Sequence, residues 1–480
     1  MSWQAAIEVS RHSGESLTTQ IQRVIKRDIR EGVLHPGTRL PASRRLADDL
    51  DVSRSVVVEA YAQLIAEGYL EAVQGSGTRV ARHLTTAHAT VVPTLLDEGR
   101  LPDVRWDLRT GTASTAHFPY REWLACYQRV LQSARRSDLD YPPLSGVPAL
   151  REELARYLGR VRAVRTTPGQ VMVVSGFAHG LGLLCAVLPG MGIDTVAMEE
   201  PGLLRQRQFV REASMRTCTV PVDAEGVDVQ ALVRTGARAV IVTPFHQFPT
   251  GVTLSAERRA ALVRWAQDVG GYVVEDDYDG DFWFDRASRP PALQRLAPDH
   301  VIYAGTTSKS LVPGLRLGWL AVPHELLAPL ERVRARRDLG SDSLTQLAFA
   351  ELLASGSFDR HMRRLRLRYR LRRATLADAV RRFLPQAHIG GSAAGLHAYL
   401  HLPRHIDESA LVASALVKSV LVRGGREFRS RPEGARPALV VGYTSLPNTA
   451  LVEGLRELGT AATDLAAGPS PTGASRSRIA

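Results

Sequence analysis

A lysine and an arginine, Lys309 and Arg316, stand seven residues apart in the stretch VIYAGTTSKSLVPGLRLGW. The stretch begins as a β-rich run and continues into a turn of small residues, so the lysine would follow the end of a buried strand. An amine condenses with an aldehyde to a Schiff base whereas a guanidinium does not, and a nearby cation suits a phosphate group. With Thr306 and Ser308 as hydroxyl donors, these residues predict a site for a phosphate-bearing aldehyde.

Lysine is rare in this chain. Lys26, Lys309 and Lys418 are the only lysines among 61 Lys and Arg residues, which leaves 58 arginines. Because arginine stands almost everywhere that a positive charge suffices, a remaining lysine marks a place where arginine cannot serve, and a nucleophilic amine is one such requirement. The alternative is that each lysine persists by chance.

Two other motifs carry groups that such a site needs. VVEDDYDGDF places Asp276 and Tyr278 at the C-terminal end of a strand, where sites form in α/β sheets. An acid that faces a pyridine nitrogen keeps it protonated, and a phenol can hydrogen-bond a ring oxygen. VMVVSGFAHGLGLL predicts a strand, a turn at Ser175-Gly176 and a helix starting near Phe177, whose backbone N–H groups can hold a phosphate.

The region from about residue 107 to 460 alternates β-rich and helical runs. The β-rich runs include VMVVSG, TVAME, RAVIVTP, GYVVEDD and HVIYAG. This alternation predicts a mostly parallel sheet with helices on both faces. The motifs SGF, HQFPTG, EDDYD and SK…R occur in the order in which they occur in fold-type I aminotransferases, and the region resembles that family. The resemblance implies an α/β fold with a small C-terminal α+β subdomain and pyridoxal 5'-phosphate (PLP) as cofactor.

The same resemblance implies a role for each residue. Lys309 would be the catalytic Schiff-base lysine, Asp276 the partner of the pyridine nitrogen and Tyr278 the ring-oxygen donor. The other cofactor-binding residues, most of them around the phosphate, would be Ser175, Gly176, Phe177, Thr306, Ser308 and Arg316. No metal site is expected.

Two positions depart from the family pattern. EEPGLLRQR has Leu203 where the family usually places an aromatic residue over the cofactor ring. ALVVGYTSL has Val440 where the family tends to have the arginine that grips a substrate carboxylate bidentately. The nearby arginines that could substitute are Arg426, Arg429, Arg431 and Arg436.

The N-terminal region has the pattern of a DNA-binding module. A helix over about 16–31 is followed by SRRLADDL with Ser43 as its expected N-cap, the tight turn DVS, and a longer helix capped by Ser53. A short second helix and a longer third one joined by a tight turn form a helix-turn-helix. YLEAVQGSGTRVA then predicts two strands around Gln74 and Gly75, a β-hairpin wing.

LPASRRLADDLDVSRSVVVEAYAQLIAEGYLEAVQGSGTRV resembles the signature of the GntR family of winged helix-turn-helix repressors. By position, the resemblance implies DNA contacts from residues at the starts of the second and third helices and at the wing tip. These residues are Arg44, Ser53, Arg54, Ser55, Gln74 and Gly75. Helix N-termini and arginine side chains suit phosphates and guanine edges.

The net charge of +12 favours polyanionic partners, but the excess lies outside this module. Residues 1–82 contain eleven Arg and Lys against ten Asp and Glu, whereas SFDRHMRRLRLRYRLRRA carries eight arginines between Arg360 and Arg373. Two interpretations stay open for that predicted helix. It is a solvated face of the large domain, or it is an auxiliary track for DNA phosphates.

These patterns predict a winged helix-turn-helix over 14–80, a linker over 81–106, an aminotransferase-like domain over 107–460 and a disordered tail over 461–480. DLRTGTASTAHFPYREW and HQFPTG resemble the MocR/GabR group of GntR-family regulators, which joins the same two parts. The three cysteines, Cys126, Cys185 and Cys218, have no metal-ligand spacing and fit buried thiols in a reducing cytosol. No run approaches the ~18–20 apolar residues of a membrane span.

The sequence therefore predicts a cytoplasmic, homodimeric, PLP-dependent transcription regulator that binds a double-stranded DNA operator. Its effector would be a small amine sensed through the internal aldimine of Lys309, or PLP occupancy itself. The alternative is a true aminotransferase that carries a DNA-binding module. We expect sensing rather than turnover, because Val440 lacks the guanidinium of the carboxylate-binding residue.

Overall fold

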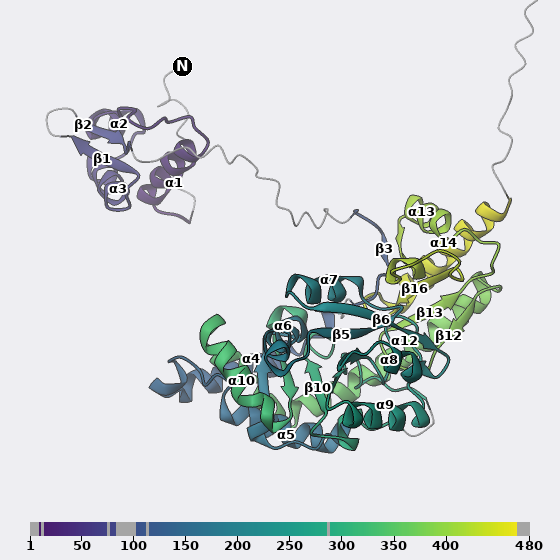
Figure 1. The fold of residues 1–480 in the computed structure, drawn as a ribbon. Coiled ribbons are helices and arrows are strands. Elements are labelled where there is room, and N and C mark those ends of the chain that lie inside the picture. Colours follow the sequence, from purple (N-terminus) through teal and green to yellow (C-terminus); the bar gives the residue numbers. More distant parts are fainter. Residues whose placement is uncertain are drawn as a thin grey trace, which may run out of the picture. The chain divides into compact units, whose positions relative to one another are not determined.

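The computed structural model describes residues 9–10, 14–73, 77–82, 102–111, 115–285 and 289–467. The chain divides into two compact units, Met1–Pro102 and Asp103–Ala480 (Figure 1). The first unit consists of α1 (Leu17–Arg30), α2 (Ser43–Asp49), α3 (Arg54–Ala66) and a hairpin of β1 (Leu70–Val73) and β2 (Gly77–Val80). The two strands are antiparallel, with Leu70 opposite Val80. The predicted helix-turn-helix with a wing is confirmed.

The first unit has a hydrophobic core of its own. Ile21 and Ile25 of α1 are fully buried against Leu46 of α2 and Leu64 of α3. The spacing of the two isoleucines places them on one face of α1, because residues four apart in a helix share a face. This core packs α2 and α3 against α1 within the first unit.

The helix starts differ in detail from the expectation. Helix α2 begins at Ser43 itself and its N-cap is Ala42, so Ser43 is not the N-cap. Ser53 does occupy the N-cap position of α3, but its Oγ lies 2.8 Å from Ser55 Oγ and makes no capping bond. The predicted wing-tip residues Gln74 and Gly75 lie outside the described residues.

The second unit contains an eight-stranded sheet in the order β4-β11-β10-β9-β8-β5-β6-β7. Its strands are β4 (Val171–Val174), β5 (Thr195–Glu200), β6 (Arg216–Asp223), β7 (Gly226–Val227), β8 (Ala239–Val242), β9 (Tyr272–Asp276), β10 (Val301–Thr306) and β11 (Gly318–Ala321). The four pairs from β10 through β9, β8 and β5 to β6 are parallel, whereas β11 and β7 pair antiparallel. All five β-rich runs of the sequence are strands of this mostly parallel sheet, as predicted.

Helices cover both faces of the sheet (Figure 1). On one face lie α4 (Tyr120–Ser133), α5 (Pro148–Arg162), α8 (Val229–Arg234), α9 (Ala256–Asp268) and α11 (Ser343–Ala354). On the other lie α6 (Phe177–Val187), α7 (Leu204–Glu212) and α10 (His324–Arg337). Alternate residues of β10 pack against the helices on opposite faces of the sheet, with Val301 and Tyr303 on the first face and Ile302 on the second.

A small subdomain completes the second unit. Its antiparallel sheet has the order β12 (His388–Gly390), β13 (His397–His401), β16 (Ala438–Gly442), β15 (Arg423–Gly424), and α13 (Glu408–Val417) and α14 (Asn448–Ala467) pack with it. The strand β3 (Trp106–Asp107) pairs in parallel with β14 (Val420–Leu421). This is the predicted small α+β subdomain.

Two predicted boundaries need correction. Helix α14 continues to Ala467, so residues 461–467 are helical and not a disordered tail, because Ala461 and Leu465 pack into the core of the small subdomain. The predicted linker reaches residue 106, yet Trp106 is buried in that same core. Residues 83–101 and 468–480 lie outside the described residues.

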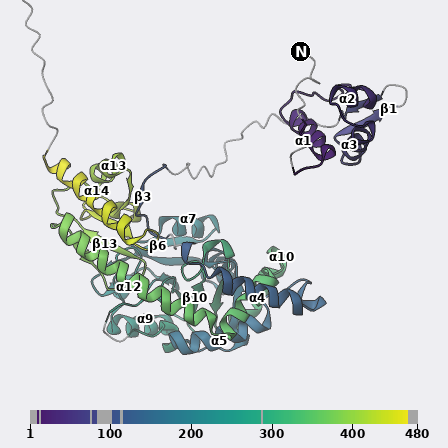
Figure 2. The same ribbon diagram turned by 180° about the vertical axis from the view of Figure 1, so that it is seen from behind.

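The arginine-rich segment lies on α12 (Ser357–Phe383), a helix that runs from beside α11 to beside α14 (Figure 2). It packs between the two halves of the second unit through buried residues that include Phe358, Met362 and Leu376. Five of the eight arginines are exposed: Arg360, Arg363, Arg364, Arg368 and Arg370. The contact of this face with DNA stays a prediction.

The cysteines Cys126 and Cys185 are buried and Cys218 is partly buried, and all three are free thiols. Within the described ranges, no helix combines the length and the apolar character needed to cross a membrane.

Because each unit has its own core, we expect Leu64→Ala to destabilise the first unit by about 2–5 kcal/mol through the cavity that it leaves. Leu262→Ala, at an equally buried position of α9, is the matched change in the second unit. Calorimetry of the full chain should show two melting transitions, each lowered by one of the two variants. A single transition lowered equally by both would contradict the independence of the units.

Candidate functional site

A cavity of about 360 Å³ lies where the carboxyl ends of the central strands meet the small subdomain. Asp276 ends β9, Thr306 ends β10, and Gly176 follows β4 by two residues. Carboxyl ends of such strands share one edge of a sheet, and that edge is where α/β proteins bind ligands. Eight of the nine predicted cofactor residues line the cavity: Gly176, Phe177, Asp276, Tyr278, Thr306, Ser308, Lys309 and Arg316.

Lys309 follows the last residue of β10 by three positions, and its Nζ donates a hydrogen bond to the carbonyl of Gly111 at 2.5 Å. Burial lowers the pKa of the Lys309 amine, although the carboxylates of Asp279 and Asp276 act in the opposite direction. A lower pKa raises the fraction of neutral amine, which is the nucleophilic form.

Asp276 is a buried residue that also lines the cavity. Burial raises the pKa of this carboxyl to about 7, the neighbouring carboxylate Asp277 acts in the same direction, and a hydrogen bond with Gln206 opposes the shift. Without a cation in front of it, this acid is therefore poised to hold a proton near neutral pH.

The acid that follows Asp276 points to the other face of the sheet and is held by a buried ion pair. Arg162, from the end of α5, donates to Asp277 through Nε at 2.6 Å and Nη2 at 3.1 Å. The Tyr303 hydroxyl donates to the same carboxylate at 2.6 Å. Because Asp277 directly follows the last residue of β9, this anchor fixes the backbone next to Asp276.

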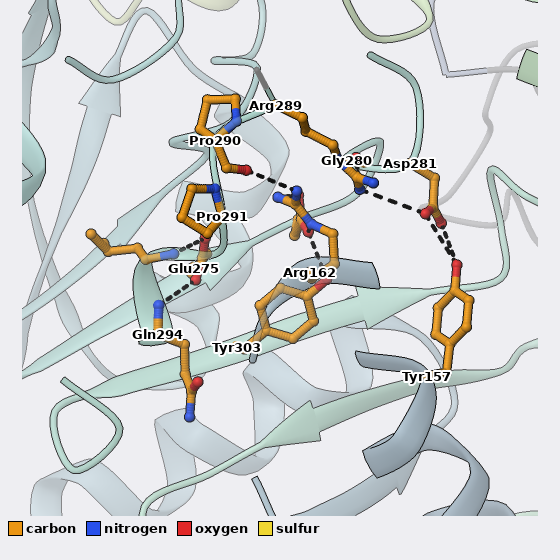
Figure 3. Close-up of polar contacts among 12 residues, drawn as sticks. Tyr157, Arg162, Glu275, Gly280, Asp281, Arg289, Pro290, Pro291, Gln294 and Tyr303 are labelled. Carbon is orange, nitrogen blue, oxygen red and sulfur yellow. Dashed lines mark hydrogen bonds and ion pairs between the residues drawn. The ribbon is translucent and has the colours of Figure 1, made fainter. Parts of the chain in front are cut away.

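The residue before Asp276 is anchored in the same way. The Glu275 carboxylate accepts hydrogen bonds from the backbone N–H groups of Leu293 at 2.8 Å and Gln294 at 2.9 Å. Further along, Asp281 accepts a hydrogen bond from the Tyr157 hydroxyl at 3.1 Å (Figure 3). The backbone around Asp276 is thus anchored by side chains that precede it and by side chains that follow it in the sequence.

Tyr278 is tied to a buried histidine. Its hydroxyl donates to the His246 carbonyl at 3.0 Å and lies 3.3 Å from His246 Nδ1. That Nδ1 lies 2.8 Å from Asp279 Oδ2. The motifs HQFPTG and EDDYD, which the sequence analysis treated separately, are therefore in contact through these three residues.

The other end of the cavity is built for an anion. Gly176, with φ +89°, is the N-cap of α6, so the first N–H groups of that helix face the cavity at Phe177. Arg316 lies against it, because a Cβ added at Gly176 would meet the Arg316 guanidinium at 3.3 Å. Thr306 and Ser308 are hydrogen-bonded to each other at 2.9 Å beside it.

Ser175 is the predicted residue that the structure does not place on the cavity wall. Its carbonyl accepts a hydrogen bond from Arg316 Nη2 at 2.6 Å, and its backbone N–H donates to His179 Nδ1 at 3.0 Å. Ser175 thus orients Arg316 rather than facing the cavity itself.

The cavity also has walls that sequence reasoning missed. They comprise Thr110, Gly111, Ala178, Gln206, Thr243, Phe248, Leu396, His397 and Arg423. Thr243 directly follows β8, so the strand-end rule that selected Asp276 could have found it. His397 and Arg423 lie on strands of the small subdomain, and nothing local in the sequence marks them.

The two departures from the family pattern have distinct outcomes. Leu203 lines the cavity, as expected, and Phe248 supplies an aromatic ring there. Val440 is fully buried on β16 and lies opposite Arg423 of β15 in register. Among the described residues that line the cavity, the arginine of the small subdomain is Arg423, not one of the four arginines proposed as substitutes.

The predicted DNA contacts lie together at two helix starts of the first unit. Arg44 is the second residue of α2, Arg54 is the first residue of α3, and Ser53 and Ser55 flank Arg54. All four are exposed. Exposed guanidinium groups at helix N-termini suit phosphates and base edges.

Two family models match the chain. The model for aminotransferase class I and II matches residues 107–444, and the model for bacterial regulatory proteins of the gntR family matches residues 17–80. The curated relatives include the pyridoxine biosynthesis transcriptional regulator PdxR of Corynebacterium glutamicum, 34% identical over 82% of this chain and 85% of that protein. They also include the probable rhizopine catabolism regulatory protein MocR of Rhizobium meliloti, 31% identical over 92% of this chain and 93% of that protein.

The chain belongs to the MocR-type branch of the GntR family. The helix-turn-helix of this family binds DNA, and the second unit has the fold of class I and II aminotransferases. The α-aminoadipate aminotransferase LysN of Thermus thermophilus, solved with N-(5'-phosphopyridoxyl)-L-leucine, is 29% identical over 75% of this chain and 92% of that protein, with a TM-score of 0.67. Lys309 and Arg423 of this MocR-type chain both line the aminotransferase-like cavity.

The raised pKa of Asp276 predicts a pH dependence for the protein without cofactor. An aspartate has an ordinary pKa of about 4 in the unfolded chain, so the folded chain binds a proton that the unfolded chain releases. The stability that this proton provides is complete below about pH 4 and is lost as the pH rises through about 7. Asp276→Asn should therefore lose less stability than the wild type between about pH 5 and pH 8.

Urea unfolding at several pH values measures this difference. Asp378→Asn, a change of an exposed acid on α12, is the control and should keep the wild-type slope. Equal slopes for wild type and Asp276→Asn would show that Asp276 is not the group that titrates.

Proposed function

We propose that the chain is a PLP-dependent transcription regulator. The winged unit binds a double-stranded DNA operator, and the second unit holds PLP on Lys309 and responds to a small amine or to PLP occupancy itself. The observation that carries the proposal is the convergence of Lys309, Asp276, Tyr278 and Arg316 on one cavity in a chain that also has a winged helix-turn-helix.

The cavity residues fit PLP. A cofactor with a pyridine ring and a phosphate needs an acid at one end and a cation with N–H donors at the other, and Asp276 and Arg316 with the start of α6 supply them. When bound, PLP supplies an aldehyde that amines attack and a ring that withdraws electrons. The Asp276 carboxyl, with its pKa of about 7, would then hold a pyridinium proton in place of its own.

Lys309 and an amine effector would compete for the same carbon of the cofactor. The half-buried Lys309 amine has a lowered pKa, which favours its neutral, nucleophilic form. Once displaced, it would return to a hydrogen bond such as that to Gly111. Lys309 contacts Gly111 from the large domain. A change in this contact would shift the equilibrium between the conformation with the effector bound and the conformation without it.

The acidic part of an effector would meet Arg423. Val440 carries no charge, but Arg423 lies opposite it on the next strand and faces the cavity, with Glu427 at 3.8 Å as its ion-pair partner. An effector carboxylate would have to compete with Glu427 for this guanidinium. The relative PdxR is named for pyridoxine biosynthesis, which supports the version in which PLP itself is the signal.

A true aminotransferase is the second candidate function, and Arg423 favours it by restoring a cation to the substrate end of the cavity. The two functions differ in their chemistry with amino acids. An enzyme given an amino donor converts all its PLP to pyridoxamine phosphate and turns over when a keto acid is added. A sensor changes its spectrum without turnover.

A second copy of the chain is the proposed partner of the second unit. Helix α4 and the loop after it expose large apolar side chains: Tyr120, Leu124, Leu131, Leu139 and Tyr141. Such a cluster is typical of a protein interface. A symmetric dimer, placed with its DNA target in the cytoplasm, would present two winged units to two half-sites.

Lys309→Arg should abolish the covalent bond to PLP, because arginine keeps the charge but does not condense with the aldehyde. Borohydride reduction followed by peptide mass spectrometry locates the adduct in the wild type, where only three lysines can carry it. Lys418→Arg, which alters a lysine paired with Asp464, is the control and should keep the adduct. An adduct that persists in Lys309→Arg would refute the assignment.

Arg54→Ala should weaken operator binding by about 1–3 kcal/mol if this residue contacts a base edge. The variant should also discriminate less between bases at one position of the operator. Arg44→Ala tests the other helix start in the same way. The control is Arg264→Ala, an exposed arginine on α9 of the second unit. Titration of labelled operator at fixed salt gives the dissociation constants, and unchanged values for both variants would remove these helix starts from the DNA-contact surface.

A further inference from the structure

A second cavity, of about 560 Å³, lies between the large domain and the small subdomain. Residues 222–224 at the end of β6 and residues 250–253 form its large-domain wall, and β13 with Arg429 and Arg436 forms the wall opposite. It shares no lining residue with the Lys309 cavity among the residues that the structure describes. Neither the proposed function nor the PLP chemistry uses it.

The charges at this second cavity favour an anion. Arg429 and Arg436 contribute two guanidinium groups to its lining, against the single carboxylate of Asp223. That carboxylate is already paired with Arg258 at 2.8 Å and accepts a hydrogen bond from the Glu225 backbone N–H at 2.8 Å. Two guanidinium groups that line one cavity are stabilised by an oxyanion that binds both.

Arg429 has an unmet hydrogen-bonding requirement. Its side chain is hydrogen-bonded to the Tyr399 hydroxyl, yet its Nε is buried and has no partner among the described residues. A buried donor without an acceptor is energetically unfavourable, so such groups usually have a ligand or a water as partner. Arg429 lines the cavity, so an anion bound there would lie beside a guanidinium that lacks one of its acceptors.

Polar side chains at the seam between the two halves complete the site. The hydroxyls of Thr253 and Ser392 are hydrogen-bonded to each other at 2.7 Å across the seam. His401 lies next to them in the lining, and its pKa is lowered by burial and by the positive charges of Arg436 and His388. The lowered pKa favours the neutral imidazole, which can donate one N–H hydrogen bond.

The two cavities share two backbone segments as a common wall. On β13 the alternate residues His397, Tyr399 and His401 project from one face, with His397 at the Lys309 cavity and the other two at the second cavity. The segment after β8 does the same, with Phe248 at the first cavity and Thr250 at the second. A ligand that binds the large domain and the small subdomain at one cavity therefore affects the position of the backbone segments that line the other cavity.

We propose that this second cavity is a binding site for a small dianionic metabolite, a phosphate ester or a dicarboxylate, held by Arg429 and Arg436. Guanidinium groups bind both kinds of oxyanion bidentately. The volume exceeds that of the Lys309 cavity, so it admits an organic anion as well as a bare ion. The bound anion would tie the small subdomain to residues 222–224 and 250–253 of the large domain.

The test is anion binding by the full chain loaded with PLP, which keeps the phosphate end of the first cavity filled. Glycerol 3-phosphate and succinate represent the phosphate esters and the dicarboxylates. Inorganic phosphate tests whether a bare ion is enough, and chloride at equal ionic strength controls for charge screening. Isothermal titration should show saturable binding of one or both organic anions. The melting temperature of the second unit should rise with them and not with chloride.

Arg436→Gln should weaken this binding about tenfold or more, and Arg429→Gln should do the same. Arg404→Gln, an exposed arginine of the small subdomain outside the lining, is the matched control and should bind as the wild type does. Because Arg429 also contacts Tyr399, the Arg436 variant keeps the test valid if Arg429→Gln folds poorly.

Wild-type affinity in Arg436→Gln, or no saturable binding of either organic anion by the wild type, would overturn the proposal. Binding of inorganic phosphate alone would also overturn it, because the proposed ligand is an organic dianion. None of these readouts depends on operator binding or on an amine effector, so failure here is distinct from failure of the proposed regulatory function.

Discussion

The buried ion pair between Arg162 and Asp277 is the interaction on which the Lys309 cavity depends. Removing two charges from water costs several kcal/mol, and the interior compensates only with good geometry and further hydrogen bonds. Here the guanidinium meets the carboxylate through two N–H groups, and the Tyr303 hydroxyl adds a third donor. With Asp277 held in place directly after β9, the backbone is fixed between Asp276 and Tyr278, which both line the cavity.

The Lys309 cavity separates charges along its length. Arg316 and the N-terminus of α6 form a cationic part of the lining, Asp276 contributes an acid, and Lys309 contributes the amine. This separation suits a molecule that carries a phosphate at one end and a basic nitrogen at the other. The small subdomain closes the cavity with His397 and Arg423, so any motion of that subdomain alters the space available to an effector.

Much of the fold was predictable because its signals are local. The helix-turn-helix, the five β-rich runs and the place of eight of the nine predicted residues on one cavity wall follow from short motifs and from the rule that sites form at strand ends. Errors arose where local composition was ambiguous. Residues 461–467 precede a stretch rich in Pro, Gly and Ser, and the prediction includes them in that tail, yet their sequence AATDLAA favours a helix, and Leu465 packs into the small subdomain.

The sequence by itself determined the chemistry: a lysine after a strand, acids at a strand end, arginines at helix starts. Only the tertiary structure decided which distant groups join them. Arg423 reaches the Lys309 cavity because β15 pairs with β16 opposite Val440, and that register is set by the packing of the whole small subdomain. Arg429 and Arg436, expected near the effector, line a different cavity for the same reason. Periodicity along a chain reports which face a residue occupies, whereas contacts between strands far apart in sequence depend on how complete layers pack.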